Sequence, residues 1–143
     1  DKVLAPLRKQ TLEMLAEYGF GYSSNYFDDD SPYLHRIDGR LTDIVEFPFA
    51  WVLDDAPYFL FTGQRAMQPP GPVLQGWLTE FEGITAMGGV TNFTFHPQII
   101  GRPSRLACLR ELMEHARHTP RVWIASLGEI SAHYRTAVES AAG

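Results

Sequence analysis

The sequence has little of what marks several large classes of protein. Its 143 residues include a single cysteine, Cys108, so the chain cannot close a disulfide bond within itself. No apolar run approaches the roughly 20 residues that a membrane-spanning helix needs, and we expect no membrane association. A formal net charge of −5 argues against a general nucleic-acid binder. A hydrophobic fraction of 45% and an aromatic fraction of 13% indicate a globular chain that forms a core.

The sequence motifs of common catalytic and cofactor sites are also missing. There is no GxSxG, P-loop, dinucleotide-binding fingerprint or HExxH string, and no Cys/His cluster with zinc spacing surrounds Cys108. The chain opens with Asp1 rather than Met, and no basic-then-apolar signal segment follows it. We therefore expect residues 1–143 to be a single segment of a longer protein, and we expect a cytoplasmic location.

Helix-type and strand-type patterns alternate along the chain. Apolar residues at three- and four-residue spacing, with Pro, Gly and capping signals, predict helices over 6–18, 72–87, 103–117 and 126–140. Alternating or β-branched runs predict strands over 20–24, 43–47, 90–95 and 121–125, with 49–52 continuing the second. Polar or Pro/Gly-rich stretches predict loops over 25–40 and 54–71. This order favours an α/β fold with a parallel sheet. The predicted strands are about half the number in an eight-stranded barrel.

Polar residues follow three of the predicted strands. In parallel α/β folds ligands bind beyond the carboxyl ends of the strands, which here are followed by residues 23–33, 51–58 and 96–98. These segments would bring carboxylates, aromatic rings and one imidazole to the same rim. His96 stands where its strand stops, and an imidazole with a pKa of about 6.5 exchanges protons readily near neutrality.

Each of these residues also has a purely structural interpretation. Asp28–Asp30 can form a solvated loop or a helix cap, and Asp54 and Asp55 can make Asx turns. Trp51 can belong to the core, and His96 can be a buried histidine bonded to a carbonyl group. Composition and spacing therefore indicate an α/β segment with a polar rim and do not define a reaction.

Four strings in order resemble the C-terminal half of a polysaccharide deacetylase of the NodB-homology type. They are EYGFGYSSNYFDDDSPY (17–33), VEFPFAWVLDDAPYF (45–59), FTFHPQIIGRPSR (93–105) and RVWIASLGEISAHY (121–134). The resemblance is to the branch that includes bacterial peptidoglycan deacetylase-like, allantoinase-like and cyclic imide hydrolase proteins. It implies a partial, distorted (β/α) barrel that lacks its N-terminal strands.

The resemblance also implies a reaction. Family members remove an acyl group from an amide nitrogen or open a cyclic amide, usually with a divalent metal. A metal-bound water attacks the carbonyl, an aspartate acts as the base and a histidine protonates the leaving nitrogen. By position, His96 matches that catalytic acid. The positions that match the family's substrate-binding segments are Asp29, Asp30, Tyr33, Trp51, Asp54 and Asp55.

The family's metal ligands and base aspartate belong to its N-terminal half, and this sequence has no counterpart of them. We therefore expect a divalent metal, zinc first among candidates, in the complete domain, and no metal ligand in this segment. The expected partner is the N-terminal half of the same barrel, on the same or a separate chain. The segment alone should not catalyse.

Two other functions stay open at this point. The chain could be a non-catalytic carbohydrate-binding piece in which Trp51, Tyr33 and Tyr58 stack on sugars, or a module that supplies half a barrel to a partner chain. Within the enzyme hypothesis, the substrate is either a polymeric N-acetylated sugar or a small cyclic imide or ureide. A homo-oligomer is equally open.

Overall fold

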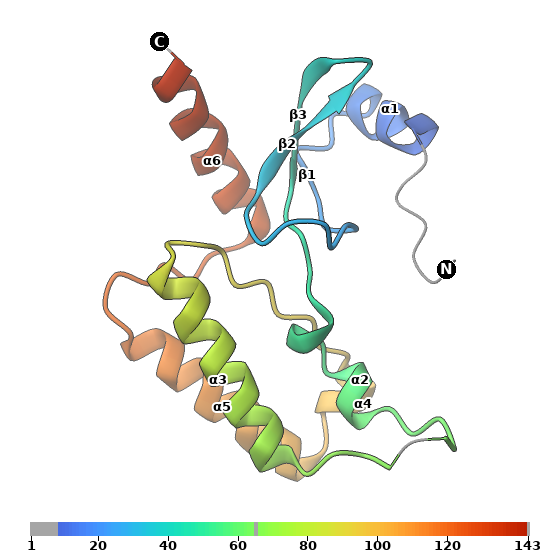
Figure 1. Ribbon diagram of the computed structural model, residues 1–143, viewed down its shortest axis with the longest axis vertical. Helices are drawn as coiled ribbons and strands as arrows, with labels where there is room; N and C mark the ends of the chain where they lie inside the picture. The colour runs from blue at the N-terminus through green and yellow to red at the C-terminus, as the bar shows by residue number, and fades with distance from the viewer. Residues whose placement is uncertain (1–8, 65, 143) are drawn as a thin grey trace. The chain divides into compact units, whose positions relative to one another are not determined.

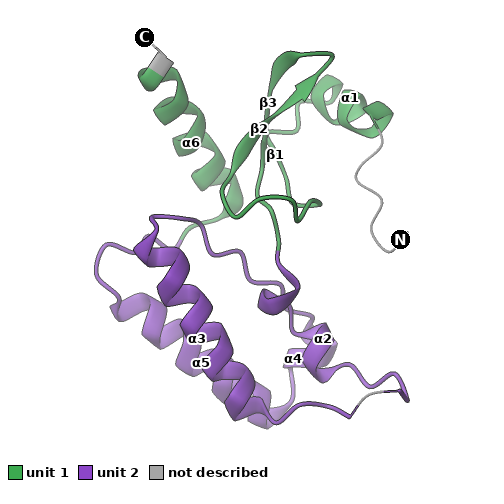
Figure 2. Cartoon of the chain, viewed as in Figure 1, with its two compact units in different colours: residues 1–49, 125–143 green, residues 50–124 purple. Residues whose placement is uncertain are grey.

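A computed structural model describes residues 9–64 and 66–142, which form a mixed helix and sheet structure (Figure 1). Its elements are α1 (Lys9–Glu17), β1 (Tyr22–Ser23), β2 (Tyr33–Ile37), β3 (Arg40–Glu46), η1 (Trp51–Leu53), α2 (Ala56–Phe59), α3 (Pro70–Ala86), α4 (Pro97–Ile100), α5 (Pro103–His118) and α6 (Leu127–Ala142). They fall into two compact units, residues 1–49 with 125–143 and residues 50–124 (Figure 2). Within the described ranges, every helix is too short or too polar to cross a membrane.

The first unit is built on a three-stranded sheet of order β1-β3-β2. β1 pairs with β3 in parallel, with Tyr22 opposite Val45, and β2 pairs with β3 antiparallel. Both α1 and α6 contact β3, and Figure 1 shows the sheet between these two helices. The side chains of Ile44, Val45 and Phe47 are buried, so the end of β3 lies in the core of this unit.

The strand β2 corrects the prediction of a continuous loop over 25–40. It forms a hairpin with β3 through Asp38 and Gly39, whose φ angles of 49° and 80° suit the tight hairpin turn that Asp-Gly favours. The prediction was wrong because the buried position of β2 is His35 instead of an apolar residue. An apolar alternation therefore does not mark this strand, although the Asp-Gly pair does signal the turn.

The second unit is mainly helical. Helices α3 and α5 pack side by side, and the short helices α2 and α4 contact each other (Figure 1). Its core cluster of buried residues consists of Phe59, Val73, Leu74, Trp77, Ile99, Ile100 and Leu112. Trp77 is fully buried and makes edge-to-face contacts with four aromatic rings, those of Tyr58, Phe59, Phe93 and Phe95.

The long helices confirm the periodicity, with small shifts at their ends. Residues 9–17 of the first predicted helix are helical, while its residues 6–8 lie outside the described part; α3 begins at Pro70 instead of residue 72. The capping box is present, since Glu129 Oε2 accepts the Ser126 backbone N–H at 2.9 Å and Ser126 Oγ accepts the Glu129 N–H at 3.3 Å.

Three strand predictions were wrong. Within 90–95, the backbone pairs only through a parallel bridge between Thr94 and Asp54, residues 121–125 form no strand, and 49–52 leads into the short helix η1. Arg121 has a φ angle of +64°, which is incompatible with an extended strand. Apolar and β-branched composition favours extended backbone, but a strand forms only where a neighbour completes its hydrogen-bond ladder.

Candidate active site

The structure brings three of the predicted site residues together in the second unit. The Nδ1 atom of His96 lies 2.6 Å from Oδ1 of Asp55 and 3.8 Å from Oδ1 of Asp54. Asp55 is completely buried, whereas 37% of the His96 side chain is exposed. A carboxylate that can only accept hydrogen bonds therefore holds one ring nitrogen, while the imidazole remains within reach of solvent.

The backbone around this pair fixes its geometry. Asp55 donates its N–H to the carbonyl of Thr94 at 3.1 Å, and Thr94 donates to the carbonyl of Leu53 at 3.0 Å. The second oxygen of Asp55 accepts the backbone N–H of His96 at 3.1 Å. Asp55 therefore binds both the main chain and the ring of His96, which orients the histidine relative to the 53–55 segment.

The contact with Asp55 also determines the protonation of His96. Because the carboxylate accepts a hydrogen bond from Nδ1, the remaining exchangeable proton of the imidazolium is on Nε2. That hydrogen bond raises the pKa of His96; burial opposes the shift, and the charges of Asp55 and Asp54 add to it. The protonated form therefore stabilises the fold at pH values below about 6.5, and this contribution is lost as pH rises through the higher folded-state pKa.

Asp54, Asp55 and His96 are also a donor set that could hold a metal ion, since one ligand atom from each lies within 4.8 Å of the others. The geometry does not favour that use. Two atoms bound to one zinc ion at about 2.0–2.2 Å lie roughly 3 Å or more apart, whereas His96 Nδ1 and Asp55 Oδ1 are at hydrogen-bond distance, 2.6 Å. Oδ1 of Asp54 is already bonded to the Ala56 N–H at 2.7 Å. Asp55 and His96 are hydrogen-bonded to each other and Asp54 is bonded to the main chain, so we derive no catalytic step through a metal at this position.

Trp51 is the fourth predicted residue in the second unit, at the start of η1. Trp51 is 45% exposed, so within this chain it is not part of the buried core. Asp54, in contrast, makes the Asx-type turn that was one of its structural interpretations, through the bond to Ala56 N–H, while still facing His96.

Asp29, Asp30 and Tyr33 belong to the first unit, in and after the loop that follows β1. Both aspartates are exposed, and Asp29 accepts the Ser31 N–H at 3.0 Å in a local turn. The hydroxyl of Tyr33 donates to Asp28 at 3.0 Å, and burial followed by this bond raises the pKa of Tyr33. Their assignment to substrate binding stays a prediction.

Sequence reasoning missed a second buried acid–histidine pair, in the first unit. Nε2 of His35 lies 2.8 Å from Oε2 of Glu46, and both side chains are almost wholly buried. The sequence predicted a loop over 25–40, which includes His35. The signal that could have revealed the strand was the Asp-Gly turn, which places residues 35 and 46 on paired strands.

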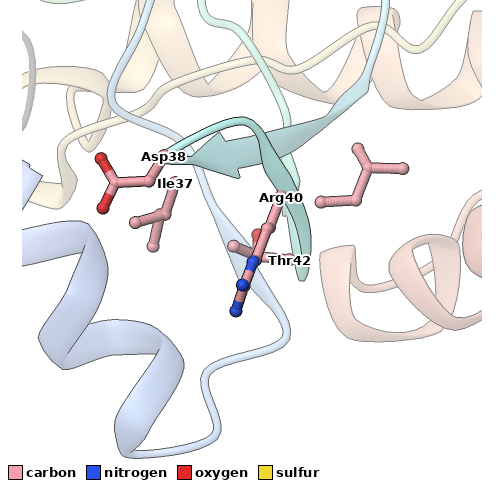
Figure 3. A pocket seen from close by; sticks show the side chains of 5 residues that line it. Ile37, Asp38, Arg40 and Thr42 are labelled. Carbon is pink, nitrogen blue, oxygen red and sulfur yellow. The ribbon is translucent and has the colours of Figure 1, made fainter.

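The hollow shown in Figure 3 lies elsewhere in the first unit, at the turn between β2 and β3. It has a volume of about 460 Å³ and is lined by Ile37, Asp38, Arg40, Leu41 and Thr42. Asp38 is ion-paired with Lys9 at 2.6 Å. None of the predicted site residues lines this hollow, and we assign it no role.

Comparison with known proteins gives consistent matches. The chain is 26% identical to the peptidoglycan deacetylase of Helicobacter pylori over an alignment that covers 80% of this chain and 49% of that protein. A solved structure assigned as a polysaccharide deacetylase from Mycobacterium smegmatis is 32% identical, with a TM-score of 0.81 over 90% of this chain and 46% of the other. The Puue allantoinase structure is 23% identical, with a TM-score of 0.70, and the match covers 89% of this chain and 43% of the allantoinase chain. At this identity the match supports the fold alone. No protein-family model matches the sequence.

The fold and the matches define the chain as part of a polysaccharide deacetylase-type barrel, which confirms the expected fold class. In sequence and in fold it is similar to part of the polysaccharide deacetylases that it matches. The chain spans about half the length of the relatives that it matches.

Proposed function

We propose that this chain supplies the catalytic acid of a hydrolase that acts on non-peptide carbon–nitrogen bonds in amides. The observation that carries the proposal is the 2.6 Å contact between buried Asp55 and partly exposed His96. A histidine oriented by a carboxylate on Nδ1 can donate the proton of Nε2 to a leaving nitrogen. The names of the relatives, a peptidoglycan deacetylase and an assigned polysaccharide deacetylase, support this class of reaction.

In this proposal the rest of the active site belongs to the N-terminal part of the barrel, on the same or a separate chain. A divalent metal, zinc first among candidates, would be held there and would polarise the substrate carbonyl when bound. Within this chain, His96 donates the proton, Asp55 holds its ring, and Asp29, Asp30, Tyr33, Trp51 and Asp54 are proposed to contact the substrate. The 143-residue chain by itself is expected to be inactive.

The test is hydrolysis by the complete protein, with an N-acetylglucosamine oligomer and allantoin as two separate probes. His96→Ala is expected to lower kcat by about 10²–10⁴-fold, the usual contribution of general acid catalysis, with bound metal unchanged. His118→Ala is the matched control, because His118 is exposed at the end of α5 and bonds to the carbonyl of Glu114. A wild-type kcat in His96→Ala, or hydrolysis of neither probe by the wild type, would contradict the proposal.

The exposed ring of Trp51 favours a second candidate function, a carbohydrate-binding piece without chemistry. A tryptophan that is 45% exposed is accessible to solvent, and tryptophan rings commonly stack on sugars. This alternative expects the complete protein to bind the N-acetylglucosamine oligomer without hydrolysing it. It also expects His96→Ala to leave that binding unchanged, whereas Trp51→Ala weakens it.

A further inference from the structure

The carboxylate of Glu46 is buried at the end of β3, and both of its oxygen atoms have hydrogen-bond partners. Its Oε1 atom accepts the backbone N–H groups of Asn25 at 2.6 Å and of Tyr26 at 2.8 Å. Its Oε2 atom lies 2.8 Å from Nε2 of His35. Burial raises the pKa of Glu46, but the bonds from His35, Asn25, Ser23 and Tyr26 outweigh it and lower the pKa overall. The group therefore stays ionised inside the first unit.

The same network extends along the loop after β1. The ring of His35 lies between those of Tyr26 and Tyr33, with centroid distances of 5.3 and 5.4 Å. The hydroxyl of Tyr33 in turn donates to Asp28 at 3.0 Å. The first residues of the loop and Asp28 are thus linked, directly or through His35 and Tyr33, to one buried carboxylate.

The loop also lies where a ligand is expected. β1 and β3 are parallel, and Ser23 and Glu46 are paired at their carboxyl ends. Ligands of parallel α/β folds bind at this edge of the sheet. The exposed tip of the loop, Asp28–Asp30, carries two of the residues proposed above to contact the substrate.

We propose that Glu46 is a positioning residue that sets the conformation of the 24–32 loop for binding the substrate. The inference rests on the proposed function and adds a residue that neither the sequence patterns nor the comparisons assign. Loss of Glu46 therefore weakens substrate binding. It leaves the proton transfer intact, because the His96–Asp55 contact forms entirely within residues 50–124. The expected signature is a change in KM without a matching change in kcat.

The experiment compares Glu46→Leu and Glu46→Gln with the wild type in the complete protein, and Glu17→Gln, an exposed glutamate on α1, is the control. In Glu46→Leu, the amides of Asn25 and Tyr26 should exchange hydrogen at least about tenfold faster, since bonds to a charged acceptor are lost. The Val45 amide, bonded to the carbonyl of Gly21, should be unchanged. With whichever probe the wild type hydrolyses, KM should rise by about tenfold and kcat should stay within about threefold.

Glu46→Gln keeps an oxygen that can accept from the loop, so it should recover part of the KM increase even where Glu46→Leu folds poorly. The inference is overturned if the Asn25 and Tyr26 amides keep their wild-type exchange in both variants, or if kcat falls while KM stays constant. A wild type that hydrolyses neither probe contradicts the proposed function instead. The amide exchange then still decides whether Glu46 orders the loop.

Discussion

The carboxylate of Asp55 binds His96 twice, through Oδ1 to the ring Nδ1 at 2.6 Å and through Oδ2 to the backbone N–H at 3.1 Å. The two residues are 41 positions apart in sequence, and the bridge between Thr94 and Asp54 aligns the segments that carry them. A side chain fixed at both its backbone and its ring loses little further freedom when a substrate binds. The arrangement suits a group that must present one proton in one direction.

Trp77 is expected to stabilise the segments on both sides of this pair. Its indole N–H donates to the carbonyl of Val52 at 2.9 Å, and its ring packs against Phe93 and Phe95, which precede His96. Trp77→Phe should lower the free energy of unfolding by at least about 0.5–1.5 kcal/mol for the lost hydrogen bond, since the Tyr58 hydroxyl still donates to the Val52 carbonyl, and Trp77→Ala by about 3–5 kcal/mol. Urea denaturation of the complete protein measures both; equal stability of all three proteins would contradict this role.

The capping box of α6 gives a prediction that depends on pH. Ser126→Ala should cost about 1 kcal/mol of stability, the usual effect of losing an N-cap side chain. The Ser126 backbone N–H and then its hydroxyl lower the pKa of Glu129, so the contribution of Glu129 is present at neutral pH and lost as pH falls through that lowered pKa. Thermal unfolding at pH 7 and pH 3 should show a smaller effect of Glu129→Gln at pH 3. An equal effect at both would contradict the cap.

The sequence was informative where a pattern is local, and much less so where structure depends on distant partners. The apolar spacing around Trp77 and the Ser126–Glu129 box predicted α3 and α6 because both signals lie within a few turns of helix. The partner of His35 could not be predicted, since its bond to Glu46 needs the register of the β2–β3 hairpin. The predicted 90–95 strand failed for the same reason. Its backbone pairs through one bridge, which composition does not reveal.

For the candidate site, the sequence predicted seven residues, and the structure shows contacts that join three of them. His96, Asp54 and Asp55 were each predicted by position, but which carboxylate holds the imidazole depends on the bridge between Thr94 and Asp54. Trp51 could equally have been a core residue. Exposure is set by what packs nearby in space, and a tryptophan's neighbours in sequence do not fix it.

Gly39 is expected to be necessary for the hairpin that brings His35 to Glu46. Its φ angle is +80°, a conformation that residues with a side chain adopt at a cost of about 1–2 kcal/mol. Gly39→Ala should therefore lower stability by about 1 kcal/mol. Gly71→Ala is the control, because the φ angle of Gly71 is not positive and a Cβ added there meets open space. If the two variants are equally stable in chemical denaturation, the turn is not strained as described.

Trp51→Ala separates binding from folding. Because the ring is 45% exposed, its loss should lower the free energy of unfolding by less than the loss of the fully buried Trp77 does. Affinity for an N-acetylglucosamine oligomer should fall by about tenfold if the indole stacks on the sugar. Isothermal titration calorimetry measures the affinity, with Trp123→Ala, a second exposed tryptophan, as the control. Unchanged affinity would remove Trp51 from the proposed substrate site.

The most direct test of the central claim is the pH dependence of kcat/KM in the wild type and in Asp55→Asn, with an NMR titration of His96 in both. The hydrogen bond to Asp55 and its charge raise the pKa of His96, so the wild type should keep its acid form, and its activity, above pH 6.5. Asp55→Asn should lower the pKa of His96 and move the alkaline limb of the profile to lower pH, while the surface control Asp38→Asn leaves both unchanged. An alkaline limb and a His96 titration that are identical in Asp55→Asn and the wild type would contradict the account.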